Sequence, residues 1–137
     1  MKTPRASAVA LAVMVVFSLP GGVVSAHHSR AGYDTDDKIT TLKGIVTESK
    51  WRNPHVFIVW GVKDDKGNVV PWTGEFSSVS TMISEGLSKD TFKVGDEIAV
   101  TFIPARAGTP QGLVIKIVRP DGKVVIDLSQ RRGIRNP

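Results

Sequence analysis

The side chains of this chain best suited to bind a metal are its three histidines, His27, His28 and His55. His27 and His28 follow an apolar leader, and His55 follows the dipeptide Asn53-Pro54. Removal of the leader after Ala26 makes His27 the amino terminus, where its free α-amino group and its imidazole can chelate one metal ion together. Imidazole nitrogens suit copper and zinc. We therefore expect His27 and His55 to share a metal site if the fold brings them together.

One amine and two imidazoles around a metal resemble the histidine brace of exported copper proteins, so copper is the first candidate metal. His28 is an alternative source of the second imidazole. Glu75 or Asp34 is the candidate oxygen ligand, and Tyr33 is a candidate for a position near the metal axis. The competing interpretation is that a histidine pair at a chain end is only polar, because three histidines without tight spacing fall short of a structural zinc signature.

A second hypothesis is a binding surface for a periplasmic partner protein or for a small anionic or sugar ligand. OB-type barrels bind ligands at the loops between strands one and two and between strands four and five. Arginine pairs with a carboxylate or phosphate, an indole stacks on a ring or sugar, and an outward phenylalanine can cover apolar surface of a partner. The candidate residues are Trp51, Arg52, Asn53, Phe57 and Arg106.

Enzymatic hypotheses find little support in the sequence. Glu75 and Asp96 are carboxylates, but nothing fixes them at the separation that glycoside hydrolysis uses. The serines at positions 77, 78 and 80 lack the GxSxG context of a nucleophile elbow, and neither a GxGxxG motif nor a P-loop occurs. The chain has no cysteine, which excludes disulfides, thiolate metal sites and cysteine nucleophiles. We therefore expect a binding protein and no enzymatic activity.

Residues 1–26 have the three parts of a secretory signal. Lys2 and Arg5 supply positive charge, residues 6–19 are small or apolar and uncharged, and Val24-Ser25-Ala26 fits a signal peptidase site. The apolar run of about 14 residues is shorter than the roughly 20 that span a bilayer. We expect a periplasmic or secreted protein that has no membrane association after cleavage.

The basic character of the chain does not come from its expected folded part. The chain carries 18 Lys and Arg against 13 Asp and Glu, a net charge of +5. Lys2 and Arg5 lie in the signal and Arg131, Arg132 and Arg135 lie near the chain end, so these five residues account for the whole excess. A nucleic-acid-binding face needs positive charge clustered on the domain itself. We therefore exclude nucleic acid as a partner.

Strand patterns follow one another at short spacing, as in small all-β domains. One stretch, residues 78–87, has apolar residues at helical spacing and falls between the third and fourth strands. Five strands with one helix at this place is the order of the OB-fold, a small Greek-key barrel, and a β-sandwich is the alternative. Gly44 fits the bend of the first strand. The expected strands are residues 39–50, 56–62, 69–76, 97–103 and 113–118, followed by a short run at 124–126.

The chain is long enough for one domain with short additions at both ends. A hydrophobic content of 41% and three tryptophans argue for a packed core. Trp60 and Trp72 are expected to lie in that core. The expected parts are a signal peptide at 1–26, an N-terminal arm at 27–38, an OB-like barrel at 39–128 and a disordered basic tail at 129–137.

Several short segments together resemble a known family. They are His27-His28-Ser29, the stretch from Trp51 to Val56, Trp72-Thr73-Gly74-Glu75, Val94-Gly95-Asp96 and Arg119-Pro120-Asp121-Gly122. Taken together they resemble a family of small exported bacterial proteins that is classed as a domain of unknown function. The resemblance covers nearly all of the chain after the signal, and it implies an exported location and a small β-domain. It implies no activity.

Overall fold

The computed structural model describes residues 31–34 and 38–134. The expected signal peptide, His27 and His28 lie outside the described residues. Every expected strand is present, with bounds that differ from the predicted ones by at most two residues, and the helix is shorter than predicted. The elements are β1 Thr40–Lys50, β2 Phe57–Lys63, β3 Val69–Glu75, α1 Val79–Ser84, β4 Glu97–Pro104, β5 Gln111–Val118 and β6 Val124–Asp127.

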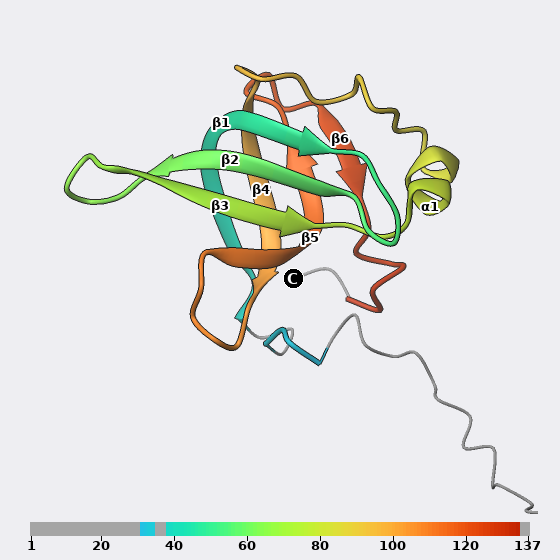
Figure 1. The fold of residues 1–137 in the computed structure, drawn as a ribbon, viewed down its shortest axis with the longest axis horizontal. Helices are drawn as coiled ribbons and strands as arrows, with labels where there is room; N and C mark the ends of the chain where they lie inside the picture. The colour runs from blue at the N-terminus through green and yellow to red at the C-terminus, as the bar shows by residue number, and fades with distance from the viewer. Residues whose placement is uncertain (1–30, 35–37, 135–137) are drawn as a thin grey trace, which may run out of the picture.

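Five strands form a closed barrel, which confirms the predicted fold class (Figure 1). β1 pairs antiparallel with both β2 and β4, β2 pairs with β3, and β4 pairs with β5. A parallel pairing of β3 with β5 closes the ring, and β6 adds a further strand beside β5. This is the strand order of an OB-fold that carries its helix between β3 and β4. The closure excludes the alternative of two separate sheets.

Aromatic and branched aliphatic side chains fill the interior of the barrel. Along β2, Ile58 and Trp60 are fully buried, while Val59 between them is only partly buried. Phe102 packs against Trp60 at a ring-centroid distance of 5.7 Å and against Trp72 at 5.1 Å. These contacts confirm that Trp60 and Trp72 belong to the core. Trp51, a candidate for stacking on a ligand, is itself partly buried against the same core.

A second apolar cluster, the outer cluster, lies on the other side of β5. Leu113 and Ile115 belong to the outer cluster, whereas Val114 between them belongs to the barrel interior. β5 is therefore buried on both faces. Ile134 from the tail is a buried member of the outer cluster, and Tyr33 from the arm is partly buried against it. Both extensions of the barrel thus contribute apolar side chains to the fold.

In the part of the tail that the structure describes, the chain is packed on the barrel, although its polar composition predicts disorder. The backbone N–H groups of Arg132 and Ile134 donate to the carbonyls of Leu128 and Ser129 at 3.0 and 2.9 Å. The Ile134 side chain is 7% exposed. The backbone hydrogen bonds and the burial of Ile134 in the outer cluster together hold this segment on the barrel. Residues 135–137 lie outside the described ranges.

α1 packs on the barrel and holds the turn that precedes β2. Ser78, the residue before α1, caps the helix: its side-chain oxygen accepts a hydrogen bond from the backbone N–H of Thr81 at 3.3 Å. The side-chain oxygen of Asn53 accepts a hydrogen bond from the N–H of Val79 at 3.2 Å, so the turn docks on the first residue of α1. Met82 anchors the helix in the core.

Within residues 31–34 and 38–134, no helix has the length and apolar character needed to cross a membrane.

Gly44 lets β1 pair with two neighbours at once. Up to Ile45, β1 pairs with β4, and from Ile45 onward it pairs with β2. A Cβ atom on Gly44 would lie 2.2 Å from the carbonyl oxygen of Gly61 in β2. Real Cβ atoms do not make contacts this short, so the close approach of the two strands requires glycine, as the predicted bend suggested.

Gly44→Ala should lower the free energy of unfolding by about 2–3 kcal/mol, because the new methyl group meets backbone that cannot rotate away. Gly61→Ala is the matched control. Its Cβ would meet a methyl group of Val69 at 2.7 Å, but the Val69 side chain is 62% exposed and can move. We expect this control to lose less than about 1 kcal/mol. Urea unfolding of both variants measures the difference, and equal losses would contradict the packing argument.

Candidate functional site

Three polar side chains from separate parts of the chain meet at the end of β3. Oε1 of Glu75 lies 2.6 Å from Nδ1 of His55. Oε2 of the same carboxylate accepts a hydrogen bond from the hydroxyl group of Tyr33. The Glu75 side chain is 15% exposed and the His55 side chain is 33% exposed. We call Tyr33, His55 and Glu75 the carboxylate cluster.

Two backbone hydrogen bonds place His55 beside Glu75. The N–H of Val56 donates to the carbonyl of Ser77 at 3.0 Å, and the N–H of Phe76 donates to the carbonyl of Val56 at 2.9 Å. The pairing of β2 with β3 therefore continues past the ends of both strands. Val56 and Phe76 are buried in the core. Because side chains alternate along paired strands, their neighbours His55 and Glu75 point outward together.

Tyr33 reaches Glu75 from the N-terminal arm. The arm is fixed to the segment after β4, where the N–H of Arg106 donates to the carbonyl of Gly32 at 2.9 Å. The Tyr33 side chain packs on the outer cluster, and its hydroxyl group donates a hydrogen bond to Glu75. The arm, the turn before β2 and the loop between β4 and β5 therefore meet at one end of the barrel, where the sequence interpretation placed the binding site.

The Glu75 carboxylate determines which nitrogen of His55 is available. An ionised carboxylate only accepts hydrogen bonds, so we assign the proton of the neutral ring to Nδ1 and the free lone pair to Nε2. In metal sites, a ligand histidine almost always donates its other ring N–H to a carboxylate or carbonyl. His55 thus presents one oriented imidazole lone pair on a side chain that solvent can reach.

Tyr33 is held in its protonated, donating form. Burial raises the pKa of the Tyr33 hydroxyl above its ordinary value of 10.0, and the hydrogen bond to Glu75 and the negative charge of Glu75 raise it further. The positive charge of Arg132 acts in the opposite direction. Both oxygens of Glu75 consequently keep their hydrogen-bond donors. This arrangement fits the role of orienting His55 better than the role of binding a metal directly.

The structure separates the other predicted binding residues into different places. Phe57 lies beside His55, with the two ring centroids 6.4 Å apart. Trp51 packs against the core and Asn53 caps α1, so both have roles in the fold. The two predicted arginines, Arg52 and Arg106, are exposed.

The described residues do not supply a complete set of metal ligands. Asp34, the alternative oxygen ligand, pairs with Lys38 at 3.4 Å. Across residues 31–34 and 38–134, no three His, Asp or Glu side chains gather closely enough to hold a metal ion. His55 with Glu75 therefore offers one ligand nitrogen, and a metal there needs further ligands from outside these ranges.

Asp96, weighed from the sequence as a catalytic carboxylate, supports the fold. Its Oδ2 accepts a hydrogen bond from the backbone N–H of Lys93 at 3.1 Å and lies 3.2 Å from Nη1 of Arg119. The hydrogen bond from the Lys93 backbone lowers the pKa of Asp96, and the Arg119 side chain lowers it further. This ion pair ties the turn before β4 to the end of β5.

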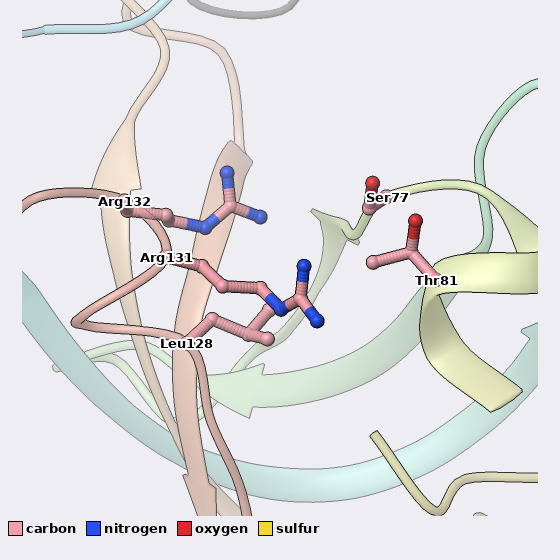
Figure 2. A pocket seen from close by; sticks show the side chains of 5 residues that line it. All are labelled: Ser77, Thr81, Leu128, Arg131 and Arg132. Carbon is pink, nitrogen blue, oxygen red and sulfur yellow. The ribbon is translucent and has the colours of Figure 1, made fainter. Parts of the chain in front are cut away.

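Sequence reasoning missed a second polar site near the carboxylate cluster. It is a pocket between α1 and the tail, and its lining includes the adjacent arginines Arg131 and Arg132 (Figure 2). The arginine pair is visible in the sequence, but the expectation of a disordered tail gives it no position in space.

Tyr33→Phe should flatten the alkaline part of the stability curve. The folded state holds the tyrosine proton more tightly than the unfolded chain does, so the stability from this group is complete below pH 10 and is lost as the pH rises through the raised pKa. We expect the unfolding free energy of the wild type to fall more steeply than that of the variant between about pH 10 and 11.

Urea unfolding at a series of pH values measures both slopes. At neutral pH, the free energy of unfolding of the variant should also be about 1–2 kcal/mol lower, because the variant lacks the hydrogen bond to a charged acceptor. Parallel curves above pH 10 would show that the Tyr33 hydroxyl does not titrate as the structure indicates.

Comparison with known proteins agrees with the family resemblance seen in the sequence. A protein-family model described as a family of unknown function, DUF6152, matches residues 15–116. This range contains all three residues of the carboxylate cluster and the strands from β1 through most of β5. No curated protein and no solved structure matches the chain. Since the family model covers well over half of its length, the chain belongs to the family of unknown function DUF6152.

Proposed function

We propose that the exported form of this protein binds copper at the end of the barrel that carries the carboxylate cluster. The proposed ligands are Nε2 of His55 and the α-amino group and imidazole of His27. The observation that carries the proposal is the 2.6 Å contact between Nδ1 of His55 and Oε1 of Glu75. This contact fixes the ring and leaves Nε2 as the nitrogen with a lone pair.

The structure changes the role that the proposal gives to Glu75. The sequence suggested Glu75 as a direct oxygen ligand, but its two oxygens already face His55 and Tyr33. A carboxylate in this position raises the basicity of the ligand histidine and fixes its orientation. Tyr33 in turn fixes the carboxylate. The proposed centre therefore has nitrogen ligands, which suit copper.

The chain length between the arm and its proposed amino terminus permits this site. His27 lies six residues before Tyr33, and six residues span at most about 20 Å when extended. Tyr33 is fixed at Glu75 by its hydroxyl group. An amino terminus created by cleavage after Ala26 is therefore within reach of His55, with His28 as the alternative imidazole.

Export is part of the proposal, because the free amine of His27 exists only after residues 1–26 are removed. The expected location is the periplasm or the medium. We propose a binding role and no enzymatic activity, with copper held rather than used in a reaction. The absence of cysteine from the chain fits a site without thiolate ligands.

Titration with Cu(II) tests the copper site. Protein that begins at His27 should bind one Cu(II) tightly, and protein with one extra residue before His27 should lose that site. Glu75→Gln should weaken binding by about 10–100-fold, because a side-chain amide that donates toward Nδ1 favours the tautomer with the proton on Nε2. His55→Ala should weaken it at least as much.

Competition with a chelating indicator measures the affinities, and Glu97→Gln is the matched control. Glu97 is exposed at the opposite end of β4 from the arm, so this variant should bind copper as the wild type does. Equal, weak binding by the two N-terminal forms would reject the proposal.

A second candidate function is the binding of a partner protein or a small anionic or sugar ligand at the same end. OB-type barrels bind ligands at the loops that follow β1 and β4. Here the arm hydrogen-bonds to the loop after β4, and Tyr33 contacts Glu75, which pairs with His55 in the loop after β1. Arg52 and Arg106 are exposed on them. Phe57 is only partly buried on the outer side of β2 and adds apolar surface.

Phe57→Asp should remove partners that the wild-type exported protein retains after cross-linking in the cell envelope, because a charge replaces the apolar surface. Lys63→Asp, at the far exposed end of β2, should leave them in place. Mass spectrometry of the cross-linked products compares the two variants. A folded Phe57→Asp protein with unchanged partners counts against this function.

A further inference from the structure

A pocket of about 250 Å³ lies between the start of α1 and the C-terminal tail. Figure 2 shows the side chains of Arg131 and Arg132 extending side by side from the tail, with both guanidinium groups turned toward Ser77 and Thr81 on the other side. Leu128 completes the lining. The five lining residues thus provide two guanidinium groups and two hydroxyl groups, and the carboxylate of Glu85 pairs with the guanidinium group of Arg131.

Glu85 fixes Arg131 and leaves most of its donors available. The Nε atom of Arg131 donates to Oε1 of Glu85. A guanidinium group has five N–H donors, so the four on its terminal nitrogens are not needed for this contact. Figure 2 shows these terminal nitrogens on the pocket side. Glu85 therefore orients Arg131 in the way that Glu75 orients His55.

Arg132 is positioned by the packing of the tail. Its backbone N–H donates to the carbonyl of Leu128 at 3.0 Å, and Ile134 beyond it is buried in the outer cluster. Its side chain is partly buried, and its positive charge acts to lower the pKa of Tyr33. A charge in partly buried surroundings is screened less than one in open water, so it attracts an anion more strongly.

We infer that this pocket binds a small oxyanion, with Arg131 and Arg132 as the main donors and the Ser77 and Thr81 hydroxyl groups as further donors. Planar guanidinium groups match the oxygens of carboxylates and phosphates and form short, charge-assisted hydrogen bonds with them. The volume lies below the roughly 300–1,000 Å³ of pockets for drug-sized ligands. A phosphate-sized ion or a small carboxylate fits this combination of charge and size.

None of the proposed copper ligands lines this pocket, and the anion proposal does not depend on the copper proposal. Ser77 follows Glu75 by two residues, so the two sites are neighbours along the chain. The test is therefore made on protein passed over a chelating resin to remove metals. A failure of the copper proposal leaves the anion result interpretable, and the reverse also holds.

Calorimetric titration of the whole exported protein with phosphate, sulfate and acetate, at constant ionic strength, tests the pocket. At least one of these anions should bind with saturation. Arg131→Gln and Arg132→Gln should each weaken binding by about tenfold or more, and Ser77→Ala should weaken it by a smaller factor. Lys63→Gln removes a positive charge from the exposed end of β2, outside the pocket, and should change the Kd by less than about twofold.

Thermal unfolding without anion checks that each variant keeps the fold. Arg131→Gln and Ser77→Ala leave Ile134 and the backbone contacts of the tail unchanged, so they decide the result if Arg132→Gln unfolds. Stronger binding of phosphate than of acetate identifies a phosphate site, and the opposite order identifies a carboxylate site. Absence of saturable binding for all three anions, or equal losses in Lys63→Gln and Arg131→Gln, overturns the proposal.

Discussion

The parallel pairing of β3 with β5 is the interaction on which the rest of the structure depends. It sets Glu75 of β3 in register with Leu113 of β5 and closes the five strands into a barrel. It also brings the end of β3 next to the outer cluster, on which Tyr33 and Ile134 pack. Without this pairing, the end of β3 would not lie beside the arm, and the Tyr33 hydroxyl group would not meet Glu75.

Glu75 then joins parts of the chain that the barrel alone does not connect. Its hydrogen bond with Tyr33 spans 42 positions in sequence, and its contact with His55 fixes the turn before β2. A carboxylate that is only 15% exposed needs such partners, because an unpaired charge in this position is costly. The contact between Glu75 and His55 therefore serves both residues. It gives the carboxylate a hydrogen-bond donor, and it gives His55 an acceptor that orients its ring.

The sequence predicts the barrel well because burial alternates along its strands, as Ile58 and Trp60 show. It predicts the contact of His55 with Glu75 less well, since that contact depends on the register of β2 with β3 two residues beyond the strand ends. The packed tail could have been suspected from residues 113–117, an apolar run that only Lys116 interrupts and that is typical of a strand buried on both faces. Such a run requires a cover, but the polar composition of the tail conceals that Ile134 provides it.

The two proposed sites lie outside the barrel interior, where the buried side chains of the described residues are all hydrophobic. Tyr33 belongs to the arm, His55 to a turn, and Arg131 and Arg132 to the tail. Each of these segments is anchored to the barrel by backbone hydrogen bonds or by a buried apolar side chain. Functional groups on such segments take their precision from the rigid scaffold below them. The buried Ile134 and the packed Tyr33 ring are therefore as important to the two sites as the polar atoms that would contact a ligand.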